Sequence, residues 1–335
     1  MDNLEKHIED FLTHIRIEKN YSEQTKHTYR IALTIFAQFL HEANLDVTDR
    51  KCITLFIRCL IERGNSDITI AHRLTVLKSF FSYLVKRKIL SKQKLPSIEK
   101  YKTTKKIISI PTDEEVNMFI NSIEEEYHEL KEKMDTAPHI NERVKAKYYS
   151  LFRDLIFFTL VTATGLRLSE ALNIKIEDMN WNDFTIKILG KGSKERLIFF
   201  GIDKLTNLFD EFSKIREKLG IESPYLFVSY QHRKVLTSRY IQKIMKVFLD
   251  KTSSPKYTPH SLRHYYATFC VEKGANIKAI AVLLGHADSS TTKKLYVHLS
   301  KKYLREVFET MNPFSNITLP VKEMMKRSCE APVNL

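Results

Sequence analysis

The chain has 335 residues, of which 43% are apolar, and its formal net charge is +14. This composition excludes a disordered chain and predicts a packed protein long enough for two domains. Only 8 glycines are present, which disfavours glycine-rich cofactor folds and favours a mainly helical protein. The basic excess indicates a polyanionic partner, most often nucleic acid; a merely soluble basic protein is the alternative.

The cysteine pattern and the N-terminal sequence indicate a protein of a reducing cellular compartment. The four cysteines form no CxxC pair, so the cytoplasm is expected. The N-terminal sequence MDNLEKHIEDF carries acids and no apolar core, unlike a signal peptide. The longest apolar stretch, residues 155–166, is shorter than the about 20 residues that span a bilayer. We therefore expect no membrane contact.

Residues 1–90 are predicted to form a helical domain. Ser22 can cap a helix with apolar residues at helical spacing: Tyr29, Leu33, Phe36 and Leu40. A later helix carries a similar face: Leu74, Leu77, Phe81 and Leu84. Basic residues lie on or beside the other faces: Lys26, Arg30, Arg73 and Lys78. We interpret these four as nucleic-acid contacts, with an ordinary solvated basic face as the alternative.

Residues 91–110 are polar and lysine-rich, which predicts a linker. A second domain is expected over residues 111–312, starting with a helix capped by Thr112. It contains a charged insertion, about 122–147, to which we assign no chemistry. Residues 313–335 are expected to be a C-terminal tail.

One β-hairpin is predicted within this second domain. Phe184, Ile186 and Ile188 alternate with other residues, residues 189–194 supply turn chemistry, and residues 196–200 can return as the second strand. The fold class is therefore mainly α with a small antiparallel β-sheet.

Four segments carry side chains suited to cutting a phosphodiester bond. In the first, Arg167 follows the break at Gly165, and Glu170 lies within reach to orient it. A planar guanidinium grips two phosphate oxygens and stays charged. A surface ion pair is the competing interpretation.

The second segment is the hairpin turn, where Lys191 can swing into a site and donate a proton. Lys194 and Arg196 beside it are candidate DNA contacts, although a basic hairpin tip is usually only solvated. The order Lys191-Gly192-Ser193 does not fit a phosphate-binding Walker A loop.

The third segment places His260 and Arg263 on one face of a helical turn. His260 and His264 also have the spacing of zinc ligands, but Ser261 stands where a zinc protease needs glutamate, so no metal site is predicted. The fourth segment holds His286 and Tyr296. Since the chain has 15 tyrosines, Tyr296 gains meaning only from the residues that precede it.

Together these segments resemble the tyrosine recombinase (phage integrase) family. The family signature is Arg, Lys, His-x-x-Arg, His or Trp, and Tyr, in that order. The matching residues here are Arg167, Lys191, His260, Arg263, His286 and Tyr296. Neighbouring words such as ATGLRLSEAL, PHSLRHYYAT and LLGH also match, and residues 1–90 resemble the SAM-like core-binding domain of Xer-type members.

The resemblance implies a site-specific recombinase that works through a 3′-phosphotyrosine and a Holliday junction. Tyr296 would be the nucleophile, Lys191 the proton donor to the 5′ oxygen, and His260 an aid to proton movement. The remaining residues would hold or support the phosphate: Arg167, Arg263, His286 and, beside the first arginine, Glu170. No metal or cofactor is implied.

The resemblance implies a double-stranded core site as partner and a homotetramer on synapsed DNA, with a helper recombinase or accessory protein as an optional further partner, in a bacterial or mobile-element nucleoid. Residues 301–314 would dock onto a neighbouring subunit.

The chain departs from Xer proteins by one extra residue between His286 and Tyr296. The resemblance starts near Met1, so no lambda-type arm-binding domain is expected.

Two alternatives share this scaffold. A type IB topoisomerase or telomere resolvase would keep the nucleophile and arginines, but the TT…Y-x-H ending and the Xer-like first domain count against it. A non-catalytic DNA-binding regulator would be expected to lose one of the six signature residues, and all six are present.

Overall fold

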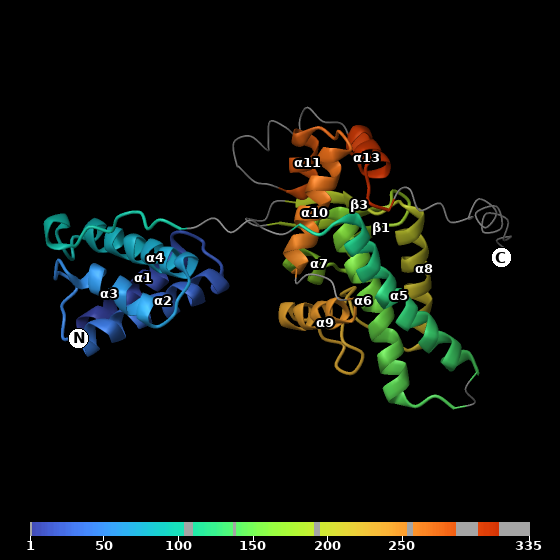
Figure 1. Cartoon of the computed structure of the whole chain (residues 1–335), viewed down its shortest axis with the longest axis horizontal. Helices are drawn as coiled ribbons and strands as arrows, with labels where there is room; N and C mark the ends of the chain where they lie inside the picture. The colour runs from blue at the N-terminus through green and yellow to red at the C-terminus, as the bar shows by residue number, and fades with distance from the viewer. Residues whose placement is uncertain are drawn as a thin grey trace. The chain divides into compact units, whose positions relative to one another are not determined.

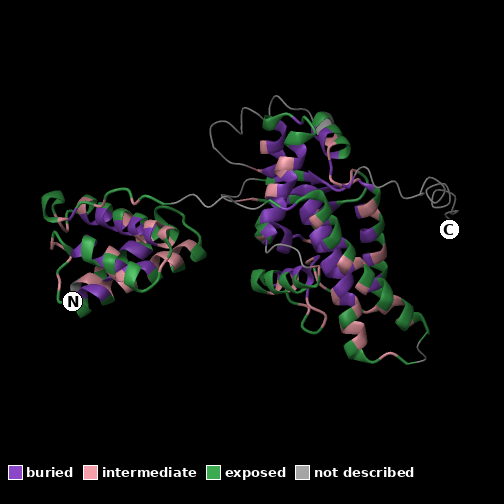
Figure 2. Cartoon of the chain, in the orientation of Figure 1, coloured by how far each residue is buried: buried purple, intermediate pink, exposed green. Residues whose placement is uncertain are grey.

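The computed structural model describes residues 2–103, 110–136, 139–190, 195–252, 257–285 and 301–314. The chain divides into two compact units, residues 1–107 and 108–335, and each has a hydrophobic core of its own (Figure 1, Figure 2). Helices dominate both units, and the described residues form one three-stranded antiparallel sheet. The predicted fold class is confirmed.

The described part of unit 1 forms four α-helices and one short 3-10 helix: α1 (Asp2–Ile17), α2 (Glu23–Glu42), α3 (Cys52–Glu62), α4 (Asp67–Lys86) and η1 (Lys92–Lys94). The predicted cap of α2 is confirmed, because the Ser22 hydroxyl accepts a hydrogen bond from the Thr25 amide at 3.2 Å. The apolar faces predicted for α2 and α4 point into the core, with these residues buried: Leu33, Phe36, Leu40, Leu74, Leu77, Phe81 and Leu84.

Unit 2 begins with two long helices that pack against each other, α5 (Asp113–Thr136) and α6 (Glu142–Thr164). The Thr112 cap is confirmed by reciprocal hydrogen bonds with Glu115, at 2.9 and 3.2 Å. The charged residues 122–136 form the C-terminal part of α5, and the charged residues 142–147 form the first turns of α6. From residue 151 to its end α6 is buried throughout, so it is the central helix of the unit (Figure 2). None of the described helices is long and apolar enough to cross a membrane.

The predicted hairpin corresponds to β2 (Thr185–Leu189) and β3 (Glu195–Phe199), and β1 (Met179–Asn180) pairs with β2, so the sheet has the order β1-β2-β3. In its register Ile188 lies opposite Arg196, and Ile186 lies opposite Ile198. Because residues two apart share a face, the register puts Arg196 on the same side of the sheet as three buried isoleucines.

The described residues of unit 2 also form α7 (Leu168–Leu172), η2 (Ile176–Asp178), α8 (Asp203–Lys218), α9 (Ser238–Lys251), α10 (Pro259–Glu272), α11 (Ile277–Leu284) and α13 (Lys301–Thr310). Helix α10 packs on α6, and α11 packs on α10 and β3 (Figure 1). Helix α13, in the segment predicted to dock onto a neighbouring subunit, packs against α11 of its own unit and buries Leu304, Val307 and Phe308.

Candidate active site

Two glycines let three helices meet at one point. Gly165 ends α6 with φ +62°, and Gly285 ends α11 with φ +63°, a left-handed conformation that favours glycine. A Cβ atom on Gly165 would lie 2.5 Å from Leu284 of α11 and 2.6 Å from Tyr266 of α10. The loop after α6 can therefore pack closely against both helices only if residue 165 lacks a side chain.

Arg167 lies two residues after this break, at the start of α7. Its guanidinium donates to Glu170 Oε1 at 2.9 Å and to the Gly285 carbonyl at 3.1 Å. Its backbone amide donates to Glu170 Oε2 at 3.0 Å. The predicted pairing of Arg167 with Glu170 is confirmed. The Arg167 side chain is 39% exposed, so a ligand can reach it.

Arg263 approaches the same point from α10. Its side chain is buried, and it donates to the carbonyls of Gly165 and Leu284, both at 2.7 Å. Burial, together with repulsion by Arg167, lowers the pKa of Arg263 to about 10, so it remains charged at neutral pH. Arg167 and Arg263 lie 96 positions apart in sequence. Both donate hydrogen bonds to the segment from 165 to 170 and to the end of α11.

His260 lies one helical turn before Arg263 and is exposed. Its ring meets the ring of His264 edge to face, with centroids 4.6 Å apart. Partial burial, followed by the charges of His264, Arg263 and Arg167, lowers the pKa of His260. A lowered pKa keeps the imidazole neutral near pH 7, which suits a group that accepts a proton.

Arg196 does not lie where the sequence analysis predicts. Its side chain is 5% exposed, so it is enclosed in the unit rather than presented to DNA. It donates to both oxygens of Glu170, at 2.9 and 2.7 Å, and to the Leu283 carbonyl at 3.2 Å. The signal that could have placed it is strand alternation, because Arg196 shares a face with Ile198.

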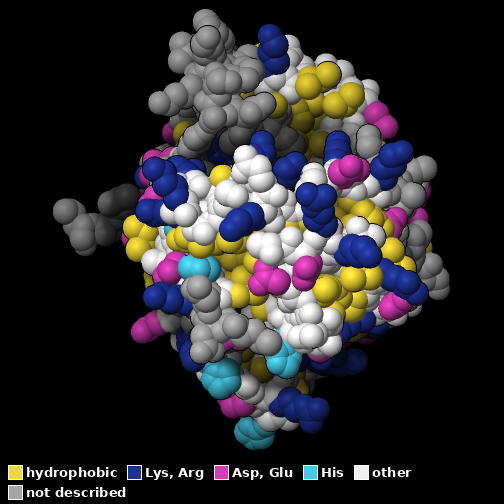
Figure 3. Space-filling model, turned by 90° about the vertical axis from the view of Figure 1, so that its left-hand side faces the viewer, with side chains coloured by type: hydrophobic (Ala, Val, Ile, Leu, Met, Phe, Trp, Pro, Cys, Tyr) yellow, Lys and Arg dark blue, Asp and Glu magenta, His cyan; other side chains and the backbone are white. Residues whose placement is uncertain are grey.

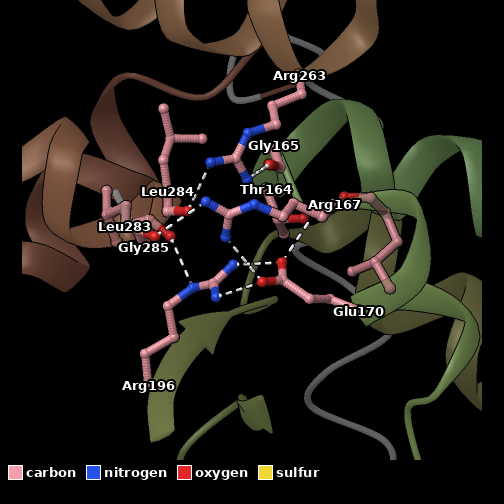
Figure 4. A network of polar contacts seen from close by, with 10 residues as sticks. Thr164, Gly165, Arg167, Glu170, Arg196, Arg263, Leu283, Leu284 and Gly285 are labelled. Carbon is pink, nitrogen blue, oxygen red and sulfur yellow. Dashed lines mark hydrogen bonds and ion pairs between the residues drawn. The ribbon is translucent and has the colours of Figure 1, made fainter. Parts of the chain in front are cut away.

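The three guanidinium groups form one row (Figure 4), with Arg167 between Arg263 and Arg196. Each donates to a different one of three successive carbonyls at the end of α11: Arg196 to Leu283, Arg263 to Leu284 and Arg167 to Gly285. The last carbonyls of a helix lack partners within it and carry partial negative charge. The arginines satisfy these carbonyls and fix the turn that leads to residue 286.

The electrostatics of this row favour an anion. Burial would raise the pKa of Glu170, but the bonds and charge of Arg196 and the bonds from Arg167 outweigh it and lower the pKa to about 2. Three guanidinium groups and one carboxylate leave a net positive charge at neutral pH. Each guanidinium has five N–H donors, so Arg167 keeps donors available on its exposed side.

The four basic residues predicted to contact DNA in unit 1 differ in their surroundings. Lys78 is exposed, and Lys26 and Arg73 are half-buried. Arg30 is half-buried and forms a bidentate ion pair with Glu9. On the face drawn in Figure 3, Lys and Arg side chains are spread among acidic ones.

Four predicted site residues lie outside the described residues: Lys191, Lys194, His286 and Tyr296. The structure describes the segments that flank them. In the sequence, β2 ends at Leu189 and β3 begins at Glu195, on either side of residues 191–194. Helix α11 ends at Leu284, two positions before His286, and α13 begins at Lys301.

Comparison with known proteins agrees with this geometry. Residues 124–303, more than half of the chain, match the model of the phage integrase family, and residues 8–88 match its N-terminal SAM-like domain. Tyrosine recombinase XerD of Staphylococcus haemolyticus is 31% identical over 316 residues, which are 92% of this chain and 99% of that protein.

Solved structures show the same fold. XerH recombinase bound to a palindromic difH substrate has a TM-score of 0.60 and 23% identity, over 90% of this chain and 83% of that one. A lambda integrase tetramer bound to a Holliday junction has a TM-score of 0.61 and 16% identity, over 87% of this chain and 76% of that one. The chain therefore belongs to the phage integrase family and is an enzyme of its Xer-like tyrosine recombinase group.

Proposed function

We propose that this recombinase cuts a specific double-stranded DNA site by attack of the Tyr296 hydroxyl on a backbone phosphorus. The bond from phosphorus to the 5′ oxygen breaks, and a 3′-phosphotyrosine forms. Lys191 gives a proton to the departing 5′ oxygen, while His260 helps to remove the proton from the phenol. Attack by a 5′-hydroxyl end on the phosphotyrosine reverses these steps and rejoins a strand.

The observation that carries this proposal is the pair of Arg167 and Arg263 beside the end of α11. The non-bridging phosphate oxygens gain negative charge in the transition state, and fixed positive donors stabilise that charge. Arg167 and Arg263 are held by backbone carbonyls and by Glu170 before any substrate arrives. His286, which directly follows the carbonyl bound by Arg167, would add a hydrogen bond to a phosphate oxygen.

We further propose that the active form is a homotetramer on two synapsed core sites, which exchanges strands in pairs through a Holliday junction. The fold shared with lambda integrase, whose structure is a tetramer on such a junction, supports this assembly. A helper recombinase or accessory protein would be an additional partner. Basic residues of both units would contact the duplex: Lys26, Arg30, Arg73, Lys78 and Lys194.

The decisive experiment is covalent capture on a nicked substrate, from which the cut fragment diffuses away and leaves the enzyme attached. Trypsin would release Tyr296 in the peptide LYVHLSK, residues 295–301, and Tyr303 in a separate peptide. We expect the nucleotide adduct on LYVHLSK alone. Tyr296→Phe should bind DNA without capture, and the matched control Tyr303→Phe should still be captured. An adduct on another peptide would refute the assignment.

A further inference from the structure

The burial of Arg196 in the sheet has an energetic cost that its contacts must offset. Arg196 shares one face of the sheet with buried isoleucines of β2 and β3, although a guanidinium is a charged group. Burying a charge is costly unless it is paired and hydrogen-bonded. Here all three nitrogens of the guanidinium donate a hydrogen bond, two of them to the oxygens of Glu170 and Nε to the carbonyl of Leu283.

These contacts connect the separate segments that carry the proposed chemistry. Arg196 binds Glu170, and Glu170 in turn accepts hydrogen bonds from both the backbone and the side chain of Arg167. Through Leu283, Arg196 reaches the turn before His286. Its own strand, β3, begins four positions after Lys191 in the sequence. A single side chain thus links three segments that are distant in sequence (Figure 4).

The fit around Arg196 is also tight. A Cβ atom on Gly285 would lie 2.7 Å from Arg196 Nη1 and 2.9 Å from its Cζ. The guanidinium therefore lies close against a glycine at the end of α11, and a displacement of Arg196 would move that turn. Lysine could not replace it, because an ammonium is a point charge without the planar fork that binds two oxygens.

We propose that Arg196 is a positioning residue for DNA cleavage, which acts through Glu170 on Arg167 and through the Leu283 carbonyl on the turn before His286. Arg196 itself does not touch the phosphate. This inference rests on the proposed function of Arg167 and His286. A purely structural ion pair would instead affect the stability of the unit and leave the chemistry of the folded enzyme unchanged.

The test measures the single-turnover rate of covalent capture, DNA affinity and melting temperature for Arg196→Lys in the full chain. A displacement of the arginine row by about 1 Å should lower the capture rate about 100-fold, with DNA affinity little changed. Arg216→Lys is the matched control. Arg216 is another buried arginine of unit 2, which donates to the carbonyls of Leu226 and Ser223, away from this row. It should lower the melting temperature without the loss in rate.

A second substrate separates positioning from structure. A methylphosphonate at the scissile position lacks one negative charge, so its cleavage depends less on Arg167. The defect of Arg196→Lys should therefore shrink on this substrate, as should the defect of Arg167→Lys. Equal defects on both substrates, or a capture rate for Arg196→Lys equal to that of the wild type, would overturn the positioning role alone. A wild-type enzyme that forms no adduct on Tyr296 would overturn the proposed function, and this inference with it.

Discussion

Glu170 binds Arg196 through both carboxylate oxygens, at 2.9 and 2.7 Å, while the same oxygens accept from Arg167. One buried carboxylate thus orients an exposed arginine with the help of an enclosed one. The arrangement explains how a site with three guanidinium groups holds together before DNA binds, because Glu170 lies between two of the charges that would otherwise repel.

This pairing predicts a specific pH dependence of stability. The pKa of Glu170 in the folded chain is about 2, below its ordinary value of 4.5, so folding favours the ionised carboxylate. The stabilisation is fully present above about pH 4.5 and is lost as the pH falls toward 2. The difference in free energy of unfolding between wild type and Glu170→Gln should shrink by up to about 3 kcal/mol across this range.

Urea unfolding at several pH values measures this difference. Glu195→Gln is the control, because Glu195 is 55% exposed in a surface pair with Lys187, and such pairs contribute little. A wild-type advantage over Glu170→Gln that stays constant down to pH 2 would contradict the prediction.

Gly285→Ala should impair cleavage by pushing on Arg196. Two effects are expected together: strain of about 1–2 kcal/mol from the left-handed backbone, and a clash of the new Cβ with the guanidinium at 2.7 Å. Gly274→Ala isolates the first effect, because Gly274 has φ +85° and no atom within 4 Å of its Cβ position. We expect both variants to lose stability in urea unfolding, and only Gly285→Ala to lose capture rate. Similar capture rates in the two variants would show that the contact with Arg196 is unimportant.

The sequence predicted much of the fold because its signals are local. The Ser22 and Thr112 caps, the break at Gly165 and the β-hairpin each depend on residues within one or two turns of the chain. The pairing of Arg167 with Glu170 was predictable for the same reason, since they lie three positions apart on a helical turn.

The place of Arg196 was not predicted, because it depends on tertiary packing. A basic residue beside a hairpin tip is usually solvated. Strand alternation with Ile198 could have indicated that Arg196 faces inward, but it does not identify the residues that Arg196 binds there. Its partners Glu170 and Leu283 lie 26 and 87 positions away. No short-range pattern reports contacts of that separation.

Lys78→Ala should weaken DNA binding and reduce its salt dependence. Lys78 is exposed on α4, and each lost phosphate contact lowers the slope of log affinity against log salt by about 1. Lys214→Ala is the control, because Lys214 on α8 is 73% exposed and paired with Asp210. Fluorescence anisotropy over a salt series should show a smaller slope for Lys78→Ala alone. Identical slopes for the two variants would remove Lys78 from the DNA-facing surface.

Removal of divalent metal should leave strand cleavage intact. A metal ion in phosphoryl transfer neutralises charge that develops on the phosphate oxygens, and here Arg167 and Arg263 are positioned to do so. Arg263, with a pKa of about 10, is charged throughout the neutral range. Capture on the nicked substrate in EDTA should therefore proceed at the rate measured in Mg²⁺ at matched ionic strength, whereas Arg263→Ala should remain inactive in both. Recovery of Arg263→Ala by added Mg²⁺, or loss of wild-type capture in EDTA, would show that a metal ion supplies charge that we assign to the arginines.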